Sequence, residues 1–148
     1  MRIEIDQSGK IEDTARNTVI AFSNTDRKSI CISSADKRTL QKIFRQKGKH
    51  KVFVYQLFAL LIFLLIKSGL RGYDSIIIDV EYEGKESLIK SFLVRYCSCN
   101  NAHFDKTIVQ FRRIGKGSPA HAYALDVLRR KRAPDTTATI EEILPYFV

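Results

Sequence analysis

Apolar and polar residues alternate at the start of the chain, the pattern of a strand with one buried face. Over residues 2–6 the isoleucines fall on one side and the carboxylates on the other. Residues 18–22 and 29–33 are two more short segments rich in β-forming side chains, separated by polar turn residues at 24–28. Because the connections are short, these segments predict an antiparallel β-meander.

From residue 34 onward the pattern changes to longer helical segments that alternate with single strands. Residues 35–46 carry a narrow apolar stripe at helical spacing, with Lys37 and other basic residues covering the remaining surface. Helical connections on both sides of a strand imply parallel pairing in the sheet. The predicted elements are helices at 35–46, 52–66, 86–96 and 118–132, a short terminal helix from 139, and strands at 75–80 and 107–114.

This order predicts a single α/β domain over residues 1–148, with a mixed five-stranded sheet and helices on both faces. A chain of 148 residues is long enough to bury a core of its own. The apolar segment 52–66 is shorter than the ~20 residues that a membrane-spanning helix needs. We therefore expect a buried helix there and no membrane association.

The chain is strongly basic, with a formal net charge of +9 from 25 Lys and Arg against 16 Asp and Glu. A basic surface favours a polyanion, and nucleic acid is the commonest one. The alternative is a domain whose solvated helix faces happen to be basic. The basic groups are Lys37, Arg38, Lys42 and Arg45; Lys47, Lys49 and Lys51; Arg112, Arg113 and Lys116; and Arg129, Arg130, Lys131 and Arg132.

The cysteines indicate a reducing compartment. Their number is three, and the first residues lack the basic and apolar regions of a secretory signal, so we expect a cytoplasmic protein. Cys97 and Cys99 with His103 suggest zinc at first sight, but a fourth ligand at useful spacing is absent from the sequence. We expect ordinary reduced thiols.

Three aspartates stand where a buried carboxylate is costly unless something charged meets it. Asp6 ends the first predicted strand, Asp79 ends the fourth, and Asp126 lies in an otherwise apolar helix. Carboxylates on converging elements are what a divalent cation requires. Glu81 lies on the same strand face as Asp79 and is a candidate further ligand.

Each acid also has a purely structural interpretation. Asp6 could open the turn that follows it, and Asp79 could simply end a strand. Asp126 could pair with Arg129 or Arg130 on its own helix. Taken together, the three positions and the basic composition favour a metal site.

The order of elements, with Asp6, Asp79 and Asp126 at these positions, resembles the ribonuclease H-like superfamily. The segment 121–126, with His121 and Asp126 close together, resembles its RuvC-type resolvase branch. The resemblance implies that Asp6 bridges two Mg²⁺ or Mn²⁺ ions, that the other acids complete the site, and that the chain hydrolyses phosphodiester bonds of structured or double-stranded nucleic acid.

One departure from that pattern leaves an alternative open. Ribonuclease H proper carries a glutamate on the helix between the third and fourth strands, whereas here the segment offers only Asp36 at its start. The alternative is therefore a catalytically inactive nucleic-acid-binding or scaffold protein on the same fold. A relative of the actin-like ATPases is disfavoured, because that fold needs two such domains to enclose a nucleotide.

Two further side chains are candidates for catalysis, and the last residues for assembly. His121 could move a proton or contact the phosphate, or it could be an ordinary histidine of a first helical turn. Lys116 could approach the substrate phosphate, although the glycines around it lack the spacing of a P-loop. The apolar residues within 140–147 must pack either on their own domain or on a second subunit, since resolvase-like enzymes act as dimers.

Overall fold

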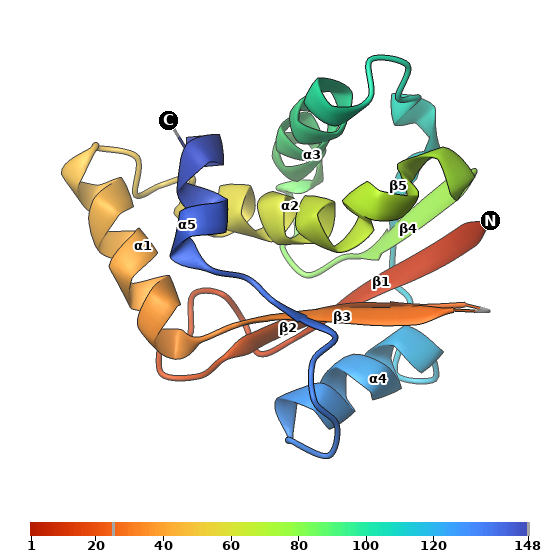
Figure 1. Ribbon diagram of the computed structural model, residues 1–148, viewed down its shortest axis with the longest axis horizontal. Coiled ribbons are helices and arrows are strands. Elements are labelled where there is room, and N and C mark those ends of the chain that lie inside the picture. The colour runs from red at the N-terminus through yellow and green to blue at the C-terminus, as the bar shows by residue number, and fades with distance from the viewer. Residues whose placement is uncertain (25, 148) are drawn as a thin grey trace.

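The fold is organised around one mixed sheet, which the computed structural model shows at the centre of the molecule (Figure 1). The structure describes residues 1–24 and 26–147, so Thr25 in the predicted turn lies outside the described residues. Within the described part the sheet has six strands in the order β5-β4-β1-β2-β3-β6. These are β1 (Arg2–Ser8), β2 (Thr18–Ser23), β3 (Arg27–Ile32), β4 (Ser75–Asp79), β5 (Val109–Arg112) and β6 (Thr136–Thr137).

The predicted pairing is confirmed, and the predicted number of strands is wrong by one. β1, β2 and β3 form the antiparallel meander, while β4 pairs in parallel with β1 and β5 in parallel with β4. The prediction of five strands missed β6, which pairs in parallel with β3. β6 has only two residues, both exposed, so it is too short to show any alternation in the sequence.

Helices cover both faces of the sheet, as predicted. Figure 1 shows α4 alone beneath the sheet and the other helices above it. The helices are α1 (Ser34–Gln46), α2 (Phe53–Ile66), α3 (Glu86–Asn100), α4 (Pro119–Leu128) and α5 (Ile140–Ile143), with 3-10 turns at η1 (Lys67–Gly72), η2 (Lys106–Ile108) and η3 (Leu144–Phe147).

The most apolar helix belongs to the core. In the described part of the chain, the continuous helical stretch Phe53–Gly72, with a mean hydropathy of 2.0, is the one long and apolar enough to cross a membrane. Its most apolar window is 72% buried inside the protein. It is therefore packed like the central helix of a soluble α/β domain; the cytoplasmic location stays a prediction.

The apolar C-terminal residues pack on the chain's own core. The ring of Phe147 meets Phe44 of α1 edge-on, with 4.4 Å between ring centroids. Tyr146 packs against Phe63 of α2 and Tyr96 of α3, with 5.5 and 5.6 Å between the ring centroids. This segment thus closes the helical layer above the sheet. The homodimer that could have used it as an interface stays a prediction.

Lys37 is buried, although its position predicted the exposed basic surface of α1. Its side chain is fully inaccessible, and burial lowers its pKa from 10.5 to about 8. The ammonium donates hydrogen bonds to the carbonyls of Lys10 and Asp13, at 3.1 and 2.7 Å, and to the Thr18 hydroxyl at 3.0 Å. Lys37 therefore ties the connection between β1 and β2 to α1.

We expect Lys37→Met to lower the free energy of unfolding by about 2 kcal/mol, because it leaves buried acceptors without a donor. The measurement is urea denaturation at neutral pH. Lys42→Met is the matched control, since Lys42 is exposed on the same helix. Equal stability of the two variants would show that the three hydrogen bonds contribute nothing to folding.

Candidate metal centre

The register between β1 and β4 brings two of the predicted aspartates side by side. Ile5 pairs with Ile78, so the residues that follow, Asp6 and Asp79, lie next to each other on the opposite face of the sheet. Glu81 comes two residues later on the same side. Single oxygen atoms of Asp6, Asp79 and Glu81 all lie within 4.8 Å of one another.

These oxygens have the separation of ligands around one divalent ion. Mg²⁺ and Ca²⁺ bind carboxylate oxygens at about 2.0–2.6 Å, so ligands on opposite sides of an ion lie roughly 4–5 Å apart. Asp6 is buried, and the other two carboxylates are half-buried. The donor set therefore fits a hard divalent cation such as Mg²⁺ or Mn²⁺.

Two of the carboxylates are already oriented by the surrounding chain. One oxygen of Asp6 accepts the backbone N–H of Gln7 at 2.8 Å, and the other lies 2.8 Å from Nδ1 of His121. Asp79 accepts the backbone N–H of Ile114 at 2.8 Å. These hydrogen bonds fix the orientation of the two aspartates.

Glu81 carries the electrostatic cost of this arrangement. Its pKa is raised from 4.5 to about 9, first by burial and then by hydrogen bonds with Asp6 and Asp79 and by the negative charges of these two groups. Three carboxylates this close need positive charge between them, supplied by a proton or a cation. Without a metal ion, the raised pKa of Glu81 favours its protonated form near neutral pH.

The start of α4 places His121 at the cluster. Ser118 is the N-cap, its hydroxyl accepting the N–H of Ala120 at 3.2 Å, and Pro119 occupies the first turn, as predicted. The buried Ala120 and Ala124 let the helix pack closely under the sheet. His121 therefore projects from the first turn toward Asp6.

Asp126 lies outside the carboxylate group, contrary to the ligand set predicted from the sequence. It follows His121 by five residues, which turns it by about 140° around the helix axis. In the part of the chain that the structure describes, no ion pair joins it to Arg129 or Arg130 either. The structure thus groups Glu81, the additional candidate, with the two strand aspartates.

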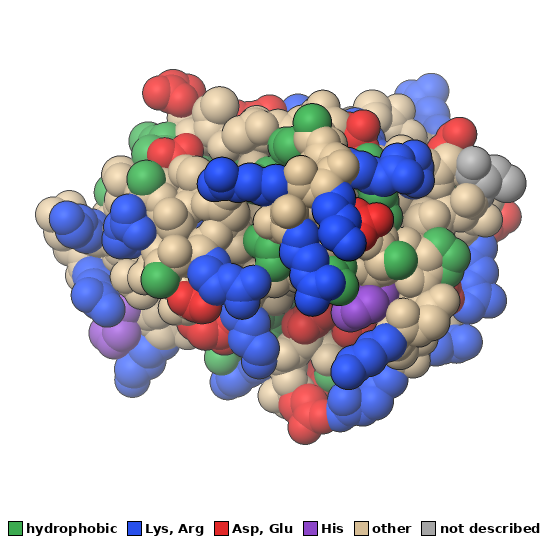
Figure 2. Space-filling model, turned by 90° about the horizontal axis from the view of Figure 1, so that it is seen from below, with side chains coloured by type: hydrophobic (Ala, Val, Ile, Leu, Met, Phe, Trp, Pro, Cys, Tyr) green, Lys and Arg blue, Asp and Glu red, His purple; other side chains and the backbone are tan. Residues whose placement is uncertain are grey.

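The carboxylates form the floor of a cleft of about 340 Å³ whose rim is basic. Lys116 and Arg113 line it from the connection between β5 and α4, and Arg113 also pairs with Glu83. Figure 2 views this side of the molecule and shows Lys and Arg side chains around acidic side chains and a histidine near its middle. Lys116 therefore lines the cleft beside the acids, and its contact with a substrate phosphate stays a prediction.

Sequence reasoning missed Tyr82, which anchors the segment that carries Glu81. Tyr82 is 9% exposed, and its hydroxyl accepts hydrogen bonds from Nε2 of Gln7 at 3.1 Å and from the N–H of Ile11 at 3.4 Å. Burial raises its pKa well above the usual value. Its position next to Glu81 could have indicated this role. Adjacent residues of an extended segment face opposite sides, so Tyr82 faces the apolar side, where a buried tyrosine needs a hydrogen-bond partner for its hydroxyl.

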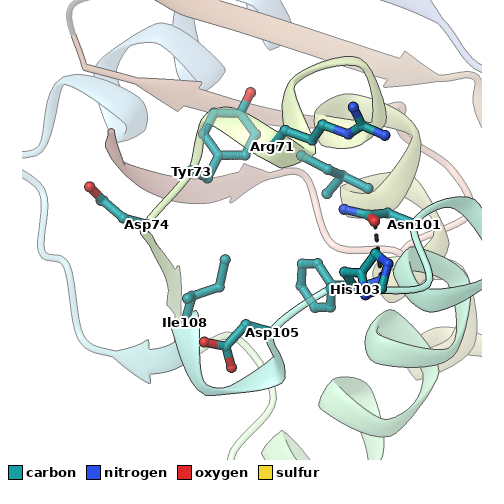
Figure 3. A pocket seen from close by; sticks show the side chains of 9 residues that line it. Arg71, Tyr73, Asp74, Asn101, His103, Asp105 and Ile108 are labelled. Atoms are coloured by element: carbon teal, nitrogen blue, oxygen red, sulfur yellow. Dashed lines mark hydrogen bonds between the residues drawn. The ribbon is translucent and has the colours of Figure 1, made fainter.

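A more voluminous cavity than this cleft lies elsewhere, at the opposite end of the strands where β4 begins. It measures about 750 Å³, and Figure 3 shows its side chains around the hollow. Its acids are engaged locally: Asp74 pairs with the N-terminal amine at 3.1 Å, and Asp105 accepts the N–H of Thr107 at 2.9 Å. This cavity has no share in the carboxylate cluster.

Comparisons of the chain with protein-family models, curated proteins and solved structures found no match. The chemistry of the site must therefore be argued from its geometry. Three carboxylates can hold a divalent cation, His121 can orient Asp6 or exchange a proton, and the basic rim can neutralise an anionic substrate.

We expect Glu81 to contribute a fall in the free energy of unfolding of the metal-free protein between pH 5 and pH 9. Over this range folded Glu81 keeps a proton that the unfolded glutamate, with a pKa of 4.5, has lost, so rising pH favours unfolding. The measurement is urea denaturation at a series of pH values with EDTA present. Glu81→Gln should remove this part of the pH dependence.

The control for this series is Glu83→Gln, because the Glu83 side chain is 70% exposed and lies outside the cluster. It should keep the wild-type slope. An unchanged slope in Glu81→Gln would show that Glu81 does not hold the proton of the cluster.

Proposed function

We propose that this chain is a metal-dependent nuclease with a ribonuclease H-like domain, which hydrolyses phosphodiester bonds of structured or double-stranded nucleic acid. The observation that carries the proposal is the convergence of Asp6, Asp79 and Glu81 within 4.8 Å at the ends of two parallel strands. The meander followed by parallel strands supports the same fold family. Ligands of open α/β sheets usually bind at this edge.

In this mechanism Asp6, Asp79 and Glu81 would hold Mg²⁺ or Mn²⁺. The bound metal would supply an activated water and positive charge for the leaving oxygen. His121 holds the second oxygen of Asp6 and can take up or release a proton. Lys116 and Arg113 at the rim attract and position the substrate phosphates.

The surface chemistry supports recognition of the nucleic acid backbone rather than of single bases. The net charge of +9 favours phosphate contacts, which are independent of sequence. Single-strand binding proteins instead stack bases on exposed aromatic rings. Among residues 1–24 and 26–147 every aromatic side chain is buried or half-buried, so such a stacking platform is absent there.

A second candidate function is an inactive nucleic-acid-binding module on the same fold. The observation in its favour is the composition of the site, in which the predicted α4 acid, Asp126, is not part of the cluster. The buried helix α2 contributes no acid either. Direct titration with Mn²⁺ separates the candidates, because an inactive site should not bind the ion even with all carboxylates intact.

We expect the wild-type protein to cleave at least one of labelled duplex DNA, RNA–DNA hybrid or four-way junction when Mg²⁺ or Mn²⁺ is present. Asp6→Asn should lower the rate by at least about 100-fold, since it removes a directly binding oxygen. Its folding and nucleic-acid binding should persist. Circular dichroism and gel-shift assays check both.

Asp126→Asn is the matched control, since it makes the same chemical change outside the cluster, and we expect it to retain cleavage. Full activity of Asp6→Asn would overturn the proposed mechanism. If Asp126→Asn loses cleavage and Glu81→Gln keeps it, the metal ligands would be Asp6, Asp79 and Asp126, the three aspartates predicted from the sequence. Binding of nucleic acid without Mn²⁺ binding or cleavage would establish the inactive module.

A further inference from the structure

A second cleft, which we call the Arg130 cleft, lies at the other end of α4 from His121. Its volume is about 350 Å³. The floor is apolar and is formed where the end of α4 packs on β2 and β3, while two arginines stand at its wall. The residues that line it include Val19, Cys31, Val127, Leu128, Arg130 and Arg132.

The Arg130 cleft has an unbalanced positive charge. Arg130 and Arg132 are both exposed, and within the described part of the chain neither guanidinium has a hydrogen bond or ion pair. The residues that line the cleft include no carboxylate. Guanidinium groups bind phosphate through paired hydrogen bonds, and the apolar floor suits the sugar attached to that phosphate.

Arg130 occupies a backbone position that usually holds glycine. The N–H of Arg130 bonds to the carbonyl of Val127 at 3.1 Å, and that of Lys131 bonds to the carbonyl of Asp126 at 2.9 Å, which is the glycine-type ending of a helix. The φ angle of Arg130 is +62°, a conformation that costs a non-glycine residue about 1 kcal/mol. Glycine would fit this backbone better, so the variant Arg130→Gly removes the guanidinium without disturbing the helix end.

The strand register places the Arg130 cleft at the same edge of the sheet as the metal centre. Val19 pairs with Ser8, two residues after Asp6 on β1, and Val19 also pairs with Cys31 on β3. Neighbouring strands are about 4.8 Å apart, so the floor lies one to two strands, up to about 10 Å, from β1. Arg130 also follows His121 by nine residues, which is about 14 Å at the helical rise of about 1.5 Å per residue, so the cleft and the metal centre are a few nucleotides apart along a bound strand.

We propose that the Arg130 cleft binds a backbone phosphate and its sugar a few nucleotides away from the phosphate at the metal centre, on the same nucleic acid strand. The identity of the ligand rests on the proposed function. Two contacts at this spacing set the direction and position of the strand across α4, so the cleft determines which bond reaches the carboxylates.

The first test measures the affinity for a short labelled DNA duplex over a series of salt concentrations, with EDTA present so that no cleavage occurs. We expect Arg130→Gly and Arg132→Gln each to weaken binding by about 5- to 10-fold, and to lower the slope of log K against log salt by about 1. The control is Arg45→Gln, which removes an exposed charge of α1 on the other face of the sheet. It should change the affinity by less than about twofold. The melting temperature of Arg130→Gly should not fall.

The second test locates the ligand through Cys31 in the floor of the cleft. The Cys99→Ser variant keeps two thiols. Cys31 is the more accessible of them, since Cys31 is half-buried and Cys97 is fully buried. Burial raises the pKa of Cys31, so alkylation by iodoacetamide is followed near pH 8.5, about the pKa of an unperturbed thiol. We expect the duplex to protect Cys31 and Arg130→Gly to abolish that protection.

The two tests distinguish failure of this inference from failure of the proposed function. If the wild type binds the duplex, but both cleft variants behave like Arg45→Gln and Cys31 stays reactive, the cleft assignment is wrong and the nuclease proposal stands. If the wild type binds no nucleic acid at any salt concentration, both are wrong.

Discussion

The parallel register between β1 and β4 is the constraint on which the candidate site depends. Ile3 and Ile5 of β1, paired with Ile76 and Ile78 of β4, are completely buried under the helical layer. A slip by one residue would turn these isoleucines toward the other face, at about 1.5–3 kcal/mol for each exposed side chain. Burial on one face of the sheet thus holds the carboxylates together on the opposite face.

The two faces of the sheet divide stability and chemistry between them. The upper face is covered by a thick apolar layer that includes α2 and the docked C-terminal segment, whereas the lower face carries only α4 over a small cluster around Val19 and Tyr123 (Figure 1). The thin cover leaves the carboxylates at the sheet edge accessible to a ligand. Their mutual repulsion is tolerated because backbone N–H groups, His121 and the proton on Glu81 offset it.

Much of the fold was predictable because its signals are local. Alternation in β1, apolar runs in α2 and β4, and the Ser118-Pro119 start of α4 each indicate an element within a few residues. β6 was not predictable, since a two-residue strand exists only where the chain after α4 meets β3. The burial of Lys37 was missed as well, because its acceptors lie 19 to 27 residues earlier, in the connection between β1 and β2 and at the start of β2.

The sequence by itself determined the order of elements, the basic character of the chain and the presence of one aspartate near the end of β1 and another at the end of β4. Only the tertiary structure decided which acids meet. Asp6, Asp79 and Glu81 converge because strand register and side-chain alternation act together, while the helical rotation between His121 and Asp126 turns the histidine toward the cluster. That choice depends on how α4 docks under the sheet, and docking is set by packing contacts between residues far apart in the chain.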